Sequence, residues 1–286
     1  MSVYPLETFS AGNEMIAYRR AGAGDPVLLI HGNLCSSVHW IPTLEKLSKT
    51  HDVIVPDMRG FGESTYANKI ETLRDLALDL EKLVDGLGIG PFKVAGWSTG
   101  GGVAMEMAAD LERITGLVLI DSVPPTGYLM YKKDENRKPI YSQPITTYEE
   151  MEADPVQVQI PLKALRTGNK AIMRRVFENS IYNIVIPPEE EYEANISATM
   201  LQRNLLEIDY ALLTFDMVKS GRLDKIKCPI HMIHGAKDKL IPLEWALKAK
   251  DLLGDRATLH VFENAGHSVL TDDPDAFFAA LAEALK

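Results

Sequence analysis

Residues 92–104 read Phe-Lys-Val-Ala-Gly-Trp-Ser-Thr-Gly-Gly-Gly-Val-Ala. The run Phe92–Ala95 predicts a buried strand, and the run that begins at Gly101 predicts a helix. Between them, Gly96 and Gly100 stand two residues to either side of Ser98. Glycine has no side chain, so both positions permit a sharp turn in which larger residues would collide. The segment therefore predicts a strand, a tight turn that presents Ser98, and a helix whose N-terminus favours negative charge near the hydroxyl.

Similar strand signals recur along the chain. The apolar runs are Pro26–Ile30, Val53–Val55, Leu117–Ile120, Ile230–Ile233 and Leu259–Phe262. Helical patterns lie between them: leucines recur every three or four residues from Leu73 to Leu87, Leu243–Leu253 precedes Gly254, and Pro274 opens a last helix. Buried strands that alternate with helices predict the α/β class, with a mostly parallel central sheet flanked by helices. We expect Val3–Phe9 and Met15–Arg20 to form an antiparallel hairpin at its edge.

The alternation stops after Ile120. From about residue 122 to about residue 214 the chain holds proline pairs, charged clusters and most of the tyrosines. Helical patterns occur near Pro161–Thr167, Ala171–Asn179 and Glu193–Tyr210, while strand signals are sparse. We therefore expect residues 1–121 and 215–286 to form the α/β core and residues 122–214 to form an inserted helical cap, or lid.

Composition excludes several classes of function. The net charge is −10 and no basic block is present, so nucleic acid is not an expected partner. No run reaches the ~18 apolar residues of a membrane span, and Met1–Phe9 lacks the features of a secretory signal. The two cysteines lie far apart in sequence, which fits a reducing compartment. We expect a cytoplasmic protein without a membrane partner, and the oligomeric state stays open.

A serine hydroxyl is a weak nucleophile unless a base removes its proton and an acid orients that base. When the serine lies on a strand–turn–helix, the expected chain order is serine, acid, histidine. The chain has Asp238 just after the strand Ile230–Ile233 and His267 just after the last predicted strand. The carboxyl ends of parallel strands are where such sheets place their sites. Asp121, which ends the strand Leu117–Ile120, is an alternative acid.

Taken together, these motifs resemble the α/β-hydrolase superfamily over nearly the whole chain. Four further segments carry the likeness, and they are His31-Gly32-Asn33, Asp57–Ser64, Gly235-x-x-Asp238 and Asn264-Ala265-Gly266-His267. The resemblance implies an α/β-hydrolase fold with Ser98 as nucleophile, His267 as general base and then acid, and Asp238 as its orienting carboxylate. It also implies an oxyanion hole made by the backbone amides of Thr99 and Asn33, with Leu34 as the neighbouring possibility.

Residues for substrate binding are harder to assign from sequence. Leu34 adjoins the expected oxyanion loop, Trp97 either walls the pocket or packs beneath the cap, and Tyr128 either lines a cleft or packs cap helices on the core. Cys35 is expected to be a small pocket-lining residue. No histidine pair has the spacing of a helical metal site and no phosphate-binding glycine loop is present, so we expect no metal and no cofactor.

The residues and the resemblance together predict a serine hydrolase that cleaves a carboxylic ester of a small or medium-sized substrate through an acyl-enzyme. A lactonase, or an intracellular polyester (hydroxybutyrate) depolymerase or oligomer hydrolase, uses the same groups. A C–C bond hydrolase, a non-hydrolytic lyase and a hydrolase-fold ligand receptor also stay open, because fold does not determine substrate.

Overall fold

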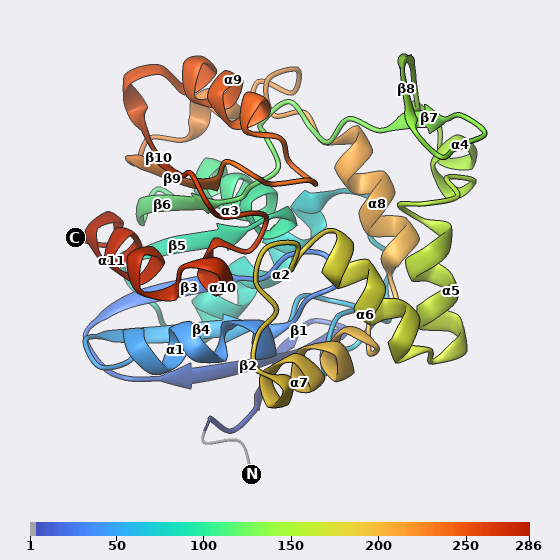
Figure 1. Cartoon of the computed structure of the whole chain (residues 1–286). Helices are drawn as coiled ribbons and strands as arrows, with labels where there is room; N and C mark the ends of the chain where they lie inside the picture. The colour runs from blue at the N-terminus through green and yellow to red at the C-terminus, as the bar shows by residue number, and fades with distance from the viewer. Residues whose placement is uncertain (1–3) are drawn as a thin grey trace.

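The computed structural model describes residues 4–286 and is built around one eight-stranded sheet (Figure 1). The strands of this sheet are β1 (Glu7–Ala11), β2 (Glu14–Ala21), β3 (Asp25–Ile30), β4 (His51–Pro56), β5 (Phe92–Trp97), β6 (Ile114–Ile120), β9 (Ile230–Gly235) and β10 (Ala257–Phe262). Their order is β1-β2-β4-β3-β5-β6-β9-β10. Strand β1 pairs with β2, and β2 with β4, in antiparallel fashion at one edge. The other neighbours in this order, from β4 through β3, β5, β6 and β9 to β10, pair in parallel. The predicted mostly parallel sheet and the antiparallel hairpin at its edge are confirmed. The first strand of the hairpin spans Glu7–Ala11 rather than the predicted Val3–Phe9, of which Val3 lies outside the described residues.

Helices cover both faces of the sheet. Those outside the 122–214 segment are α1 (Ile41–Leu47), α2 (Leu73–Gly86), α3 (Thr99–Asp110), α9 (Leu243–Leu253), α10 (Val269–Asp272) and α11 (Pro274–Ala284). Short 3-10 turns are η1 (Ser37–Trp40), η2 (Leu223–Lys225) and η3 (Gly254–Arg256). Helices α1 and α11 pack in one apolar cluster, whereas α2, α3 and α9 pack in the cluster on the opposite face. A strand buried on both faces needs apolar residues at every position, which explains the continuous runs in the sequence.

The predicted helices begin and end for identifiable reasons. Thr72 and Asp75 form a reciprocal capping box at the start of α2, which buries Leu73, Leu76, Leu80 and Leu83 in the core. Gly254 ends α9 at a positive φ of 61°, a conformation that glycine adopts without steric cost. Asp273 caps α11, and Pro274 occupies its first turn.

Residues between β6 and β9 contain five helices at one end of the sheet, at the right of Figure 1. They are α4 (Tyr148–Glu152), α5 (Gln159–Thr167), α6 (Lys170–Asn179), α7 (Glu189–Thr199) and α8 (Leu205–Thr214). A small antiparallel hairpin of β7 (Tyr131–Lys133) and β8 (Pro139–Pro144), which the sequence did not predict, precedes them. We call residues 122–214 the cap.

The prediction of one helical segment over Glu193–Tyr210 is wrong in its middle. Helix α7 ends at Thr199 and α8 starts at Leu205. In the interval, the Arg203 amide donates to the Gly60 carbonyl at 2.9 Å and the Asn204 side chain donates to the Arg59 carbonyl at 2.7 Å. These bonds to the core take the backbone away from the helical path. Among residues 4–286, no helix combines the length and the apolar character required to cross a bilayer.

Candidate active site

Ser98 lies in a strained turn between β5 and α3. Its φ of 56° and ψ of −119° are in a region that non-glycine residues rarely adopt. A side chain at Gly96 would come within 2.2 Å of the Gly100 carbonyl oxygen, and one at Gly100 would come within 2.4 Å of the Ile30 carbonyl oxygen. The Ser98 amide is held by the Ile120 carbonyl at 2.9 Å. The two flanking glycines thus permit the strained conformation that presents the Ser98 hydroxyl.

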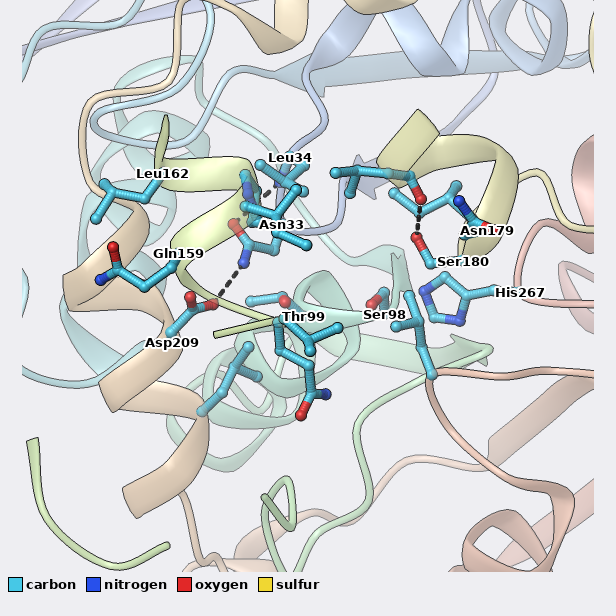
Figure 2. A pocket seen from close by; sticks show the side chains of 18 of the residues that line it. Asn33, Leu34, Ser98, Thr99, Gln159, Leu162, Asn179, Ser180, Asp209 and His267 are labelled. Carbon is cyan, nitrogen blue, oxygen red and sulfur yellow. Dashed lines mark hydrogen bonds between the residues drawn. The ribbon is translucent and has the colours of Figure 1, made fainter. Parts of the chain in front are cut away.

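His267 and Asp238, which come later in the chain than Ser98, lie in contact with each other. His267 Nδ1 and Asp238 Oδ2 are 2.7 Å apart, and both residues are buried. The other Asp238 oxygen accepts from the Leu240 and Ile241 amides at 2.7 and 2.9 Å, which fixes the carboxylate. Figure 2 shows the Ser98 hydroxyl beside the His267 ring, and both residues line one cavity. With Nδ1 directed at Asp238, Nε2 is the ring nitrogen left for the serine.

Asp121, the alternative acid, has different partners. Its carboxylate accepts from the Gly235 amide at 2.8 Å and the Val269 amide at 3.4 Å. Complete burial, together with the nearby charge of Asp238, raises the pKa of Asp121 well above its usual range. Among the described residues, no hydrogen bond joins Asp121 to His267. Asp121 therefore holds together the loops that carry Asp238 and His267.

Asp121, His234 and Asp238 also form a cluster whose polar atoms lie within 4.8 Å of one another. His234 Nε2 lies 2.9 Å from the Ile241 carbonyl oxygen, and burial lowers the pKa of His234. All four oxygens of the two carboxylates have N–H partners. Hydrogen bonds within the protein thus account for the arrangement of this cluster.

The loop after β3 supplies a backbone donor on the other side of Ser98. The Leu34 amide donates to the Asn33 Oδ1 and Gln202 Oε1 atoms, each at 3.0 Å, so it is already engaged. Within residues 4–286, the Asn33 and Thr99 amides have no hydrogen-bond partner in the protein, and both residues line the cavity. Of the two candidates in this loop, Asn33 is the one with a free amide.

Three cap residues hold this loop, and sequence reasoning missed all of them. Thr199 donates to the Leu34 carbonyl at 2.6 Å, Gln202 donates to the Asn33 side chain at 2.8 Å, and the Asn33 side chain donates to Asp209 at 2.9 Å. They stand more than 160 positions further along the chain. No local sequence signal marks them, because the contact exists only once the cap packs on the core.

The cavity has a volume of about 1090 Å³, which lies at the upper end of ligand pockets. Figure 2 shows Ser98 and His267 at one end, Asp209 and Gln159 at the other, and Thr99 between them. Burial raises the pKa of Asp209 to about 8, and its second oxygen is buried without a partner within the described residues. The far end of the cavity thus has a carboxyl group that is largely neutral at pH 7.

Leu34 and Tyr128 line this cavity, whereas Trp97 and Cys35 do not. Trp97 is buried behind the site, packs edge-to-face on Trp40, and donates from its indole nitrogen to the His267 carbonyl at 2.8 Å. As the last residue of β5, it points away from the cavity, so its expected contact with substrate is corrected to support of the His267 loop. Cys35 is buried away from the cavity, and burial raises the pKa of its thiol.

Hydrogen bonds and an ion pair within the protein hold the turn after β4 that carries the Asp57–Ser64 motif. Asp57 accepts from the Ser37 amide at 2.6 Å and the Glu63 amide at 3.0 Å, and Arg59 pairs with Asp79 at 2.6 Å. His31 Nε2 accepts from the Met58 amide at 3.0 Å, which connects this turn to the loop after β3.

Comparison with known proteins shows relatives over almost the whole chain. The 2-hydroxymuconate semialdehyde hydrolase of Pseudomonas sp. strain CF600 is 27% identical over 92% of this chain and 89% of its own length. The pimeloyl-[acyl-carrier protein] methyl ester esterase of Aliivibrio fischeri is 23% identical over 92% of this chain and 95% of its own. An esterase from Exiguobacterium antarcticum has a similar structure, with a TM-score of 0.75, 20% identity, and coverage of 95% of this chain and 96% of the esterase.

The family comparison covers the parallel strands of the sheet, the cap and all three candidate catalytic residues. A family profile described as the alpha/beta hydrolase fold matches residues 25–274, well over half of the chain. Together with the parallel sheet and the strained serine turn, this match shows that the protein is a member of the α/β-hydrolase family.

Proposed function

We propose that the protein is a serine hydrolase that cleaves a carboxylic ester of a small or medium-sized substrate through an acyl-enzyme. The observation that carries this proposal is the 2.7 Å contact between His267 Nδ1 and Asp238 Oδ2 beside a serine on a strained turn. Such a contact fixes the imidazole tautomer and stabilises the imidazolium that forms when the serine loses its proton.

The reaction follows from these positions. His267 Nε2 takes the proton of Ser98 Oγ as the oxygen attacks the ester carbonyl. The carbonyl oxygen becomes negative, and the free amides of Asn33 and Thr99 donate hydrogen bonds to it. One such donor typically contributes ~10²–10³ in rate. His267 then protonates the departing alcohol, and it later activates the water that releases the acid from Ser98.

The cavity and the relatives bear on the substrate. A volume of about 1090 Å³ leaves room for an acyl or alcohol group much larger than acetyl. The relatives include a methyl ester esterase and a hydrolase that cleaves a semialdehyde. Lactones, hydroxybutyrate oligomers and diketones are alternative substrates, because Ser98, His267 and Asp238 could also cleave the bonds in these compounds. A ligand receptor or a lyase would show little ester turnover.

The first test is covalent labelling. A fluorophosphonate probe should attach to the peptide that contains Ser98, as read by mass spectrometry, and should inactivate cleavage of p-nitrophenyl butyrate. Ser98→Ala should lose labelling and reduce kcat by ~10⁴-fold or more. Ser220→Ala, an exposed serine outside the cavity, is the matched control and should behave as the wild type. Undiminished cleavage by Ser98→Ala would remove the proposal.

The second test is a substrate panel. Acyl chains of increasing length, lactones, hydroxybutyrate oligomers and a diketone would be compared by kcat/KM on the purified protein. Rapid turnover of linear esters alone supports the proposal as stated, whereas selective turnover of one of the other classes would replace the ester by that class.

A further inference from the structure

The charged side chains around the cavity have the opposite balance to the chain as a whole. The chain contains 30 lysines and arginines against 40 aspartates and glutamates. Among the described residues, however, four cationic side chains line the cavity against a single carboxyl group. The cations are Lys163, Arg166, Arg175 and Lys239, and the carboxyl is Asp209. An acidic protein thus lines the cavity that contains Ser98 and His267 with a net positive charge.

Asp209 does little to neutralise this charge. Burial raises its pKa to about 8, so most of the carboxyl carries its proton at pH 7. The Asn33 side chain donates to it at 2.9 Å, and the described residues place no cation against it. The cavity therefore has four positive side chains and almost no compensating negative charge at neutral pH.

The four cations also lack partners, unlike their neighbours in the cap. Arg174 pairs with Glu189 and Glu193, and Lys170 pairs with Glu193 at 2.6 Å. Arg175 is the next residue after Arg174, but it lines the cavity and has no ion pair within residues 4–286. The same holds in that range for Lys163, Arg166 and Lys239. Acidic side chains of the cap thus neutralise cations such as Lys170 and Arg174, but within the described part of the chain they do not pair with the cations that line the cavity.

Three of the cations come from the cap and one comes from the core. Lys163 and Arg166 are on α5, Arg175 is on the neighbouring helix α6, and Lys239 follows β9 directly after Asp238. All four are exposed, so water screens them until a ligand enters. A cleft lined by charge of one sign raises the local concentration of ligands of the opposite sign.

We propose that the substrate carries an anionic group, a carboxylate or a phosphate, remote from the bond that is cleaved, and that Lys163, Arg166, Arg175 and Lys239 bind this group. The inference rests on the proposed function, because it assumes that the bond next to Ser98 is the one cleaved. The remote anion then remains beside the exposed cations, while the uncharged ester reaches Ser98.

The test uses ethyl esters of matched length at pH 7. Monoethyl adipate carries a carboxylate, ethyl hexanoate is neutral, the ethyl ester of aminohexanoic acid is cationic, and the ethyl ester of phosphorylated hydroxyhexanoic acid carries a phosphate. We expect kcat/KM for an anionic ester to exceed that for the neutral ester by between about threefold and about 100-fold, as a few exposed ion pairs allow. The cationic ester should be the poorest. The carboxylate and phosphate arms identify which anion is preferred.

Salt and a triple variant then locate the effect. The preference for the anion should shrink as NaCl rises, since the screening length falls from ~10 Å at 0.1 M to ~3 Å at 1 M. A triple variant combines three substitutions at exposed positions, Lys163→Gln, Arg166→Gln and Arg175→Gln. Its kcat/KM for the anionic ester should be close to its kcat/KM for the neutral ester. The quantity compared is the ratio of kcat/KM for the anionic ester to kcat/KM for ethyl hexanoate, measured on the same protein. The control variant Lys49→Gln with Lys219→Gln removes two exposed charges that do not line the cavity and should keep the preference.

The outcomes separate this inference from the proposed function. If the wild type cleaves ethyl hexanoate through Ser98 but shows no preference for an anion, the inference is wrong and the proposed function stands. The inference is equally wrong if the triple variant keeps the preference. If no ester is cleaved through Ser98, the proposed function itself fails.

Discussion

The central strands and the cap differ in how far their apolar side chains are exposed to solvent. In β3, the residues from Val27 to Ile30 are at most 1% exposed. The described large apolar side chains that are exposed number eleven, and six of them belong to the cap, which is less than a third of the chain. These six are Leu129, Tyr141, Ile184, Val185, Ile186 and Leu201. We call the sheet and the turns at the ends of its strands the scaffold. Apolar side chains are buried more completely in the scaffold than in the cap.

The strand ends and the cap also contribute different residues to the candidate site. The strained Ser98, the Asp238–His267 pair and the free Thr99 amide all belong to turns anchored on parallel strands. The cap supplies the far end of the cavity and most of its charged lining. The residues that we propose for catalysis thus lie at the ends of regular strands, whereas most of the residues that we propose for binding the substrate's anionic group lie on the cap.

The largest expected effect contrasts two acids of the scaffold. Asp238→Asn should lower kcat by ~10⁴-fold, because an amide cannot hold the His267 tautomer that accepts the serine proton. Asp121→Asn should cost far less activity, since its carboxylate contacts the Gly235 and Val269 amides and not His267. Steady-state kinetics on p-nitrophenyl butyrate, with Tm measured in parallel, checks both. A greater loss of kcat from Asp121→Asn at unchanged Tm would transfer the role of acid to Asp121.

The next contrast sets a scaffold glycine against a cap glycine. A methyl group at Gly100 would lie 2.4 Å from the Ile30 carbonyl oxygen, so Gly100→Ala should destabilise the fold by about 3 kcal/mol or more. Gly168, at the end of α5, has a φ of 64°, and no atom of residues 4–286 lies within 4 Å of such a methyl group. Gly168→Ala should cost only the left-handed strain of ~1–2 kcal/mol. Thermal unfolding of the two variants measures the gap, and equal losses would refute the distinction between scaffold and cap.

A third prediction concerns Asp209, the buried carboxyl of the cap. Its folded pKa of about 8 exceeds the unfolded value of about 3.8, so the folded state binds the extra proton between these values. The stability that this group contributes therefore falls as pH rises from about 4 to about 8. Asp209→Asn removes the titration and should gain Tm relative to the wild type as pH rises from 5 to 8. Over that range, the difference in the free energy of unfolding between Asp209→Asn and the wild type should change by at most ~4 kcal/mol.

The control for Asp209→Asn is activity at pH 6, where an amide resembles the neutral acid. It should stay within a few-fold of the wild type, in contrast to Asp238→Asn. A Tm difference that does not depend on pH would show that Asp209 is ionised throughout the range.

The smallest expected effect concerns the support behind His267. Trp97→Phe removes the donor to the His267 carbonyl and should reduce kcat by less than about tenfold, with ~1–3 kcal/mol of stability lost. Trp40→Phe is the matched control, because the Trp40 indole nitrogen is buried and has no partner among the described residues. Its kcat should change less than that of Trp97→Phe. The reverse order would show that the hydrogen bond to His267 is unimportant.

Much of the scaffold follows directly from local patterns. The strands around Leu28, Val94 and Val118 are continuous apolar runs because both faces are covered, and Gly96 and Gly100 are glycines because any side chain would meet a carbonyl. The order Ser98, Asp238, His267 also points to its chemistry without coordinates, since each residue follows a predicted strand at the same edge of a parallel sheet. Local sequence is informative there because regular strands restrict where each residue points.

The cap shows what sequence alone could not provide. The break between α7 and α8, the engaged Leu34 amide and the bond from Asn33 to Asp209 all depend on contacts between residues more than 140 positions apart. The sequence suggests Trp97 as a pocket residue, yet the pleat of β5 directs it to the opposite side, and Tyr128 lines the cavity only because α8 and the loop before β7 meet there. Periodicity specifies which elements form and which of their faces are apolar. The packing of irregular cap segments on the core decided the shape and charge of the cavity, because those long-range contacts leave no pattern in the local sequence.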